Sequence, residues 1–316
     1  MKLREIYELA VELGMEYDPR GKAEVEKSLA KKKEVYDGLK DDEKEFFDTD
    51  ALTNPYADTR ILTGDSEAEI SGIFTGIDME AQEVVLADRL KEKGESIDLI
   101  FAHHPEGKAL AALAEVMGMQ ADIWATLGVP INIGDALIGE RLTEVQRGLM
   151  PINHNEAVDA ARLLGFSFMC CHTPCDNLVT DFVQKHIDAK APETLGDVVK
   201  ALKEIPEYKA AAKDKAGPNV LVGDSGKRTG KIVVDMTGGT EGPEAAMEKL
   251  ADAGVGTIIG MHFSEKLRKK AGESHVNLIV AGHIASDAIG MNLFLDKLKA
   301  KGVKIIAGAG LVRVER

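Results

Sequence analysis

The sequence lacks the cysteine content of a disulfide-stabilised protein. Its 316 residues include 3 cysteines and a single tryptophan, and only 5% of them are aromatic. The three cysteines are clustered: Cys170, Cys171 and Cys175. Because an odd, clustered set makes a poor disulfide framework, we expect free thiols in a reducing compartment.

Long apolar runs and an excess of positive charge are also missing. No run approaches the roughly 18 apolar residues that span a bilayer, and the opening stretch, MKLREIYELAVELG, carries charges where a signal peptide has an apolar core. Acidic residues outnumber basic ones by 53 to 39, and the formal charge of −14 repels nucleic acid and anionic lipid. We therefore expect a cytoplasmic protein with no membrane or nucleic-acid partner and a small molecule as its candidate substrate.

Common nucleotide and hydrolase motifs are absent as well. The stretch GDSGKRTGK (223–231) looks like a phosphate loop, but no glycine stands five positions before either Gly-Lys pair. The stretch GVGTIIG (254–260) enters a predicted strand, whereas a dinucleotide fingerprint leaves one. Neither H-E-x-x-H nor G-x-S-x-G occurs. The familiar P-loop, Rossmann, zincin and serine-hydrolase signatures are thus excluded.

What the sequence does contain is an α/β pattern. Residues 1–55 predict a helical extension of charged, amphipathic helices, which a stretch containing Asn and Pro ends. Beyond it, short apolar runs alternate with amphipathic helices, as in parallel or mixed sheets. We predict a first α/β half over 56–192 with a helical insertion at about 108–153, a connection over 193–229, and a second α/β half over 230–316.

The two halves resemble each other. The stretch from SGIFTGID to AHHPE aligns with that from GKIVVDMT to GMHFSE and places His104 opposite His262. The stretch FMCCHTPCDNLV aligns with IVAGHIASDAIG, so a His-x-x-x-Asp directly follows a predicted strand in each half. This similarity predicts internally duplicated α/β halves whose mixed or parallel sheets face each other.

Histidines gather at the ends of the predicted strands, where open α/β sheets place their ligands. The residues at such ends are His103, His104, His172, His262 and His283. A carboxylate one helical turn after a strand-end histidine can point into the same crevice. Imidazole and carboxylate together suit Zn, Fe, Mn or Co, and two such sets can hold two metal ions.

Each histidine also has a plainer interpretation. Neighbours in a strand point to opposite faces, so His103 and His104 can reach one site only where Pro105 breaks the strand. His172 is either a ligand or a group that orients the carboxylate four residues later, and His262 is either a ligand or a packing residue. The remaining histidines lie in polar or helical contexts and are interpreted as surface or structural residues: His154, His186 and His275.

The CCHTPC stretch has an alternative interpretation as a thiolate zinc site. It lacks the second C-x-x-C pair that such sites use. We interpret Cys170 as a small buried hydrophobe. Cys175 stands beside a candidate ligand, and its role stays open between packing and an oxidisable thiol.

Three motifs resemble those of a known family. AHHPEG, CHTPCD and AGHIASD are similar, in content and order, to the HHP, H-T-x-x-D and G-H-x-x-x-E motifs of the NGG-one-interacting-factor-three family, whose members are often described as GTP cyclohydrolase type 2-like. The stretch ADTRILTGDSEAEISGIFTGID also resembles that family's D-N-x-G-L-x-x-G-D segment and first strand. The resemblance covers roughly residues 57–310. It implies a duplicated α/β fold, a dinuclear metal centre between the halves and a homo-oligomer.

Carried over by motif, the resemblance implies five metal ligands: His103, His104, Asp176, His283 and Asp287. It places His172 beside the metals, where a side chain with a reference pKa near neutrality is a candidate for proton transfer. Asp287 departs from the family, which has Glu at this position, and Asp58-Thr59 departs from the family's Asp-Asn.

These observations favour a protein that binds two divalent metal ions and acts as a metal-dependent hydrolase. The family's usual description implies a purine nucleotide as the substrate. The alternative is a non-catalytic metal-binding protein with a regulatory or structural role, in which the metals hold the halves or the oligomer together. Open coordination positions would favour the enzyme, and a closed shell of protein ligands would favour the alternative.

Overall fold

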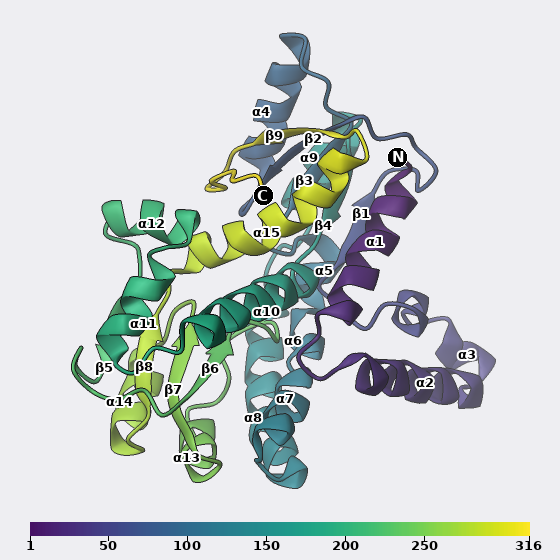
Figure 1. The fold of residues 1–316 in the computed structure, drawn as a ribbon. Coiled ribbons are helices and arrows are strands. Elements are labelled where there is room, and N and C mark those ends of the chain that lie inside the picture. The colour runs from purple at the N-terminus through teal and green to yellow at the C-terminus, as the bar shows by residue number, and fades with distance from the viewer.

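The N-terminal extension is helical, as predicted. In the computed structural model, which describes residues 1–316, it comprises α1 (Leu3–Glu16), α2 (Lys22–Gly38), α3 (Asp41–Lys44) and the 3-10 helix η1 (Thr49–Leu52). Helix α1 buries Leu3, Ile6 and Ala10 at helical spacing in the core of the first sheet. Helix α2 buries only Val25 and projects from the body of the protein (Figure 1). The extension is therefore attached mainly through α1.

The strands form two sheets of mixed direction. The first has the order β1-β4-β3-β2-β9 and consists of β1 (Arg60–Thr63), β2 (Gly72–Gly76), β3 (Leu99–Ala102), β4 (Ser167–Cys170) and β9 (Lys304–Ala307). The second has the order β5-β8-β7-β6 and consists of β5 (Asn219–Val222), β6 (Lys231–Asp235), β7 (Val255–Gly260) and β8 (Asn277–Val280). Only β1–β4 and β5–β8 pair antiparallel. This mixed α/β architecture confirms the predicted fold class.

Strands β1 to β4 and β5 to β8 repeat one arrangement, which confirms the internal duplication. The edge strands β1 and β5 carry one irregularity in register each, at equivalent places. Both strands lead into a Gly-Asp-Ser turn whose glycine has a positive φ, 111° at Gly64 and 105° at Gly223. Only glycine adopts this conformation without steric cost, so the two turns share the same requirement.

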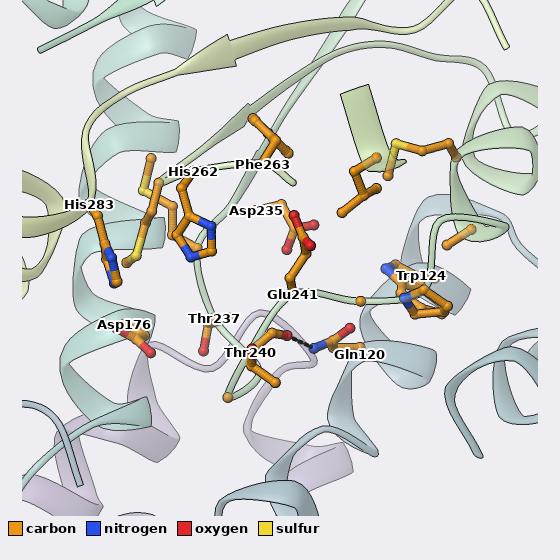
Figure 2. Close-up of a pocket in the computed structure, with 18 of the residues that line it drawn as sticks. Gln120, Trp124, Asp176, Asp235, Thr237, Thr240, Glu241, His262, Phe263 and His283 are labelled. Atoms are coloured by element: carbon orange, nitrogen blue, oxygen red, sulfur yellow. Dashed lines mark hydrogen bonds between the residues drawn. The ribbon is translucent and has the colours of Figure 1, made fainter. Parts of the chain in front are cut away.

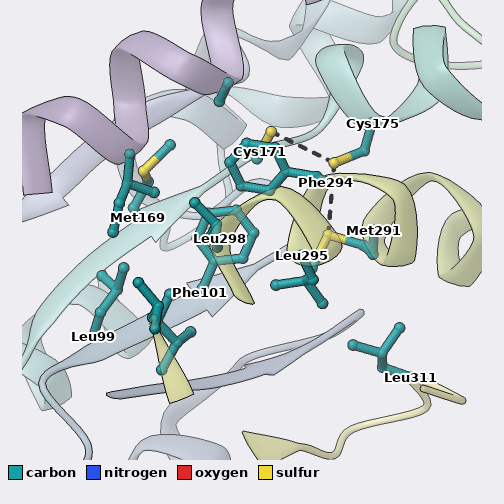
Figure 3. Packing of buried hydrophobic residues seen from close by; sticks show 14 of the residues in the cluster. Leu99, Phe101, Met169, Cys171, Cys175, Met291, Phe294, Leu295, Leu298 and Leu311 are labelled. Atoms are coloured by element: carbon teal, nitrogen blue, oxygen red, sulfur yellow. Dashed lines mark hydrogen bonds between the residues drawn. The ribbon is translucent and has the colours of Figure 1, made fainter. Parts of the chain in front are cut away.

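Each half contributes one long helix that covers the sheet of the other half. The helices of the first half are α4 (Ala81–Glu92), α9 (Glu156–Leu163) and α10 (Thr173–Lys190), and those of the second are α13 (Ala246–Asp252), α14 (Glu265–Glu273) and α15 (His283–Ala300). Helix α10 packs Val179 and Val183 in the core of the second sheet. Helix α15 stacks Phe294 on Phe101 of the first sheet, with ring centroids 5.5 Å apart (Figure 3). The two halves are thus interlocked.

The insertion packs against the second half. The insertion forms α5 (Gly107–Ala111), α6 (Leu113–Val116), α7 (Met119–Leu127) and α8 (Ile131–Leu149), and the connection contains α11 (Leu195–Leu202) and α12 (Pro206–Lys213). From the insertion, Trp124 and Ile138 share a core cluster with Met247 and Leu278 of the second half. None of the helices combines the length and apolar character that crossing a bilayer requires.

The strand pairing departs from the predicted division in two places. Strand β5 lies in the stretch predicted as a connection, yet it is an edge of the second sheet. Strand β9 lies in the predicted second half, yet it pairs with β2 of the first sheet. The cause is that an apolar run indicates a strand but does not indicate which sheet it joins.

Candidate metal centre

Six side chains meet between the sheets, at the carboxyl ends of strands and the first turns of α10 and α15. They are His103 and His104 after β3, His172 and Asp176 at the start of α10, and His283 and Asp287 at the start of α15. These six residues are called the candidate metal centre. It brings together all five predicted ligands and His172.

The local sequence explains how α10 and α15 bring their first turns together. Pro174 lies in the first turn of α10, where its fixed φ favours helix initiation. Gly282 has a φ of 112° before α15, and a Cβ there would lie 2.5 Å from the Ala216 carbonyl oxygen. The two helices then cross so closely that a Cβ on Gly290 would lie 2.2 Å from the Cys175 carbonyl oxygen. Glycine is therefore required at both approaches.

Asp287 lies at the middle of the candidate metal centre, with different imidazoles facing its two oxygens. Its Oδ1 is 3.5 Å from His103 Nε2. Its Oδ2 is 3.4 Å from His104 Nε2 and 3.5 Å from His283 Nε2. The Nε2 atom of His103 also lies 3.4 Å from Asp176 Oδ1. Two sets of three ligand atoms therefore share Asp287, one with His103 and Asp176 and one with His104 and His283.

Several of these atoms are buried without any hydrogen-bond partner: His103 Nε2, Asp176 Oδ1 and both carboxylate oxygens of Asp287. A buried polar atom left without a partner costs about 1–3 kcal/mol, so four in one place require an explanation. Ligand atoms about 2.1 Å from one tetrahedral ion lie about 3.4 Å from each other. The observed spacings match that geometry, and the buried cluster is compatible with metal binding.

Hydrogen bonds on the far side of three imidazoles orient the rings. His103 Nδ1 donates to the Cys171 carbonyl oxygen at 3.1 Å, and His104 Nδ1 donates to Asp78 Oδ1 at 2.6 Å. His172 Nδ1 donates to Asp58 Oδ2 at 2.8 Å. In this tautomer each Nε2 keeps its lone pair for the centre, as in metal-bound histidines.

The electrostatics of the candidate metal centre favour bound positive charge. Burial alone would lower the pKa of His103, but the facing carboxylates of Asp287 and Asp176 raise it well above its usual value. Burial would raise the pKa of Asp287, but the imidazoles of His103, His104 and His283 hold it below its usual range. Buried, ionised carboxylates need compensating cations, which divalent metals supply.

Comparison with known proteins supports one family. No protein-family model and no curated protein matches the chain. A solved structure of a NIF3 superfamily protein from Sphaerobacter thermophilus shares 28% sequence identity and a TM-score of 0.70, over 81% of this chain and 92% of that chain. This similarity supports membership of the NIF3 superfamily.

More distant structures are also similar to this chain. Reduced HcgD from Methanocaldococcus jannaschii is 15% identical with a TM-score of 0.49, over 78% of this chain and 87% of that chain. A Bacillus cereus protein related to NIF3 is 13% identical with a TM-score of 0.43, over 79% of this chain and 89% of that chain.

The other histidines lie outside the candidate metal centre. The exposed ring of His262 lies 4.8 Å from the His283 ring, centroid to centroid, but belongs to no set of ligand atoms. His154 and His186 hydrogen-bond to main-chain carbonyls, at 3.0 and 2.9 Å. His275 has a positive φ of 58° at the end of α14. These positions agree with packing or surface roles.

All three cysteines are buried in apolar surroundings. The Cys175 Sγ lies 3.5 Å from Cys171 Sγ and 3.7 Å from Met291 Sδ (Figure 3). Burial raises the pKa of Cys170 to about 12. None of the three thiols belongs to a set of neighbouring ligand atoms, and all three lie in hydrophobic core clusters beside the centre.

Sequence reasoning missed the supporting carboxylates and the cavity beside the centre. Asp78 stands two residues after β2, at the same sheet end as the histidines, and this position was the available signal. Asp58 was noted only as a departure from the family's pattern. A cavity of about 110 Å³, called here the side cavity, extends from His172 and His283 to Trp124 of α7 (Figure 2). Its walls come from segments far apart in the chain, so no local pattern indicates it.

Proposed function

We propose that this protein binds two divalent metal ions and acts as a metal-dependent hydrolase. The first ion would be held by His103, Asp176 and Asp287 Oδ1, and the second by His104, His283 and Asp287 Oδ2. One observation carries the proposal: both oxygens of Asp287 are buried without partners, and each lies within 3.5 Å of a different imidazole. The mixed imidazole and carboxylate set suits Zn, Fe, Mn or Co.

Access from solvent supports a catalytic role over a purely structural one. The side chains of His104 and His283 are 26% and 39% exposed, and the side cavity opens beside His283. Structural metal sites are closed by protein ligands, whereas catalytic sites keep a position open. When bound, divalent ions lower the pKa of a coordinated water and polarise a carbonyl or phosphoryl oxygen.

His172 is the candidate for proton transfer. Asp58 accepts hydrogen bonds from His172 Nδ1 at 2.8 Å and from Thr173 Oγ1 at 2.6 Å, which fixes the ring and its tautomer. The His172 Nε2 then lies on the side of the centre, 3.8 Å from Asp176 Oδ2, and can hold or release a proton there. His172 also forms a set of neighbouring ligand atoms with His103 and His104, so it is an alternative third ligand.

Elemental analysis tests metal binding. Protein expressed with added metals should contain about two divalent ions per chain. His104→Ala should lower the content, whereas the control His186→Ala should not, because His186 bonds only a main-chain carbonyl. A folded wild type that contains no metal would overturn the proposal.

A substrate screen separates the hydrolase from the non-catalytic alternative. The metal-loaded protein should hydrolyse at least one member of a panel of nucleotides, phosphoesters and cyclic amides. His172→Ala should abolish turnover while keeping both ions if the residue transfers protons, and should lose metal if it is a ligand. A loaded protein that hydrolyses nothing would favour a regulatory or structural metal site.

We also propose a homo-oligomer in the cytoplasm. The family resemblance supports it, and the edge strands β5 and β9 of the two sheets remain partly exposed. Light scattering should report more than one chain per particle at micromolar concentration. A monomer would contradict this part of the proposal.

A further inference from the structure

The side cavity combines aromatic and acidic groups with the histidines at its inner end. Trp124 and Phe263 line it, and the carboxylates of Asp235 and Glu241 lie between Trp124 and the histidines His262 and His283 (Figure 2). No lysine or arginine lines it. A single water needs about 10–15 Å³ of such volume, so a cavity of about 110 Å³ can admit part of an organic molecule.

The carboxylate of Asp235 makes no hydrogen bond or salt bridge with another residue. It ends β6, at the position that Gly76 occupies in β2, as the pairing of each strand with its parallel neighbour shows. Its carboxylate is half-buried, and burial is the sole cause that raises its pKa to about 6. The equivalent first-half position needs no side chain at all, so the duplicated fold does not require a carboxylate here. A carboxyl group without a partner in a cleft is a candidate for ligand recognition.

Glu241 and Trp124 are held in place around Asp235. The main-chain amide of Ser264 donates to Glu241 Oε1 at 2.6 Å, which leaves the other oxygen free. Gln120, one turn before Trp124 in α7, donates to the carbonyl oxygens of Gly238 and Thr240, both at 2.7 Å. The insertion of the first half therefore shapes the loop that forms the cavity wall.

These groups select for one kind of chemistry. Carboxylates attract a cation and donate no hydrogen bonds, and the face of an indole ring adds a cation–π attraction. Beside Trp124, Asp235 and Glu241, a phosphate would meet carboxylates without the arginine or lysine that normally binds it.

We propose that the side cavity binds a planar nitrogen cation, such as an amidinium group, through Asp235, Glu241 and the ring of Trp124. This inference rests on the proposed function, because the cation would belong to the substrate whose bond lies at the metal centre. It names the substrate class as a cationic nitrogen compound and excludes a phosphate from this cavity.

The sole tryptophan provides a direct test, since its fluorescence reports on the cavity wall. Metal-loaded protein is titrated with benzamidine and with benzamide, a neutral molecule of the same shape. Benzamidine should change the Trp124 emission and bind at least about tenfold more tightly than benzamide. Asp235→Asn should remove this preference and leave benzamide binding unchanged. The control Glu244→Gln removes an exposed charge outside the cavity and should keep the preference.

The outcomes separate this inference from the proposed function because metal content is measured on the same samples. Equal binding of the two probes by the metal-loaded wild type would overturn the inference alone. A preference that survives Asp235→Asn would also overturn it. A clear preference in a protein that takes up no metal would support cation binding and overturn the hydrolase proposal.

Discussion

The two halves share one topology but contribute unequally to the candidate metal centre. The first half supplies His103, His104 and His172, each with an acceptor fixed to its Nδ1. The second half supplies His283, whose pKa is lowered chiefly by burial. No hydrogen-bond acceptor holds its ring. The first half thus holds its imidazoles more rigidly than the second.

Strand register shows which residues of the second half stand at the positions of Asp78 and His103. Thr237 occupies the position of Asp78, and Met261 occupies that of His103. The second half instead carries Asp235 where the first has glycine. The difference indicates a division of roles after duplication, in which the first half orients imidazoles of the candidate metal centre and the second half supplies Asp235 and Glu241 to the side cavity.

The largest effect is expected from Asp58, the first-half carboxylate that orients the ring of His172. Asp58→Asn should lower turnover of any substrate found in the screen by about 10²–10⁴-fold, because His172 loses the charge that orients and stabilises its ring. Metal content should stay unchanged. The control Asp65→Asn removes an exposed carboxylate of the same half and should have no effect on kcat. Full activity of Asp58→Asn would remove Asp58 from the proposed mechanism.

In the metal-free protein, removing a candidate ligand of the first half should destabilise the fold more than removing one of the second half. His103→Ala leaves Asp176 and Asp287 facing each other in a buried site, so the free energy of unfolding should fall by about 3 kcal/mol. His283→Ala removes a more exposed ring and should cost less than about 1 kcal/mol. Urea unfolding after chelation measures both. Equal losses would contradict the difference in rigidity between the halves.

The crossing of α10 and α15 provides a test of how the halves interlock. Gly290→Ala would drive a methyl group into the Cys175 carbonyl and should destabilise the protein by about 1–3 kcal/mol. The control Gly272→Ala, in α14 with nothing within 4 Å of its Cβ position, should stabilise it by about 0.4–1 kcal/mol. Similar stability of the two variants in thermal unfolding would show that the helices separate easily.

A smaller effect is expected where the second half carries Asp235. Because burial raises the pKa of Asp235 to about 6, the native protein binds this proton more tightly than the unfolded chain. The resulting stabilisation is complete at acidic pH and is lost as the pH rises through about 6. Asp235→Asn should therefore raise Tm by about 2–4 °C at neutral pH relative to wild type. No gain at neutral pH, or an equal gain at acidic pH, would contradict the burial of this carboxyl.

The sequence predicted the duplication and placed five ligand positions that the structure brings together. The duplication was predicted from the similarity of the two halves. The five ligand positions follow from family motifs that contain histidines at strand ends and carboxylates one helical turn later. The alignment by histidines was off by one residue at the second motif. Strand register makes Cys170 equivalent to Val280. Two residues then precede His283 but only one precedes His172, so the second half has one additional residue there. The exchange of long helices could not be predicted, since apolar periodicity does not specify which sheet a helix covers.

The side cavity depends on contacts between distant segments. Gln120 reaches the carbonyl of Gly238 across 118 residues, and neither residue carries a motif. Such contacts arise from tertiary packing of the insertion against the second half. The cavity is therefore visible only in the structure.

The metal content of Asp287→Asn tests the central claim most directly, because Asp287 is the residue on which the ligands of both halves converge. The substitution keeps the shape of the side chain but removes its charge. Elemental analysis should find about two ions per chain in the wild type and in Asp287→Glu, which restores the family's residue, but at most about one in Asp287→Asn. Two ions retained by a folded Asp287→Asn would contradict a shared, bridging carboxylate between the halves.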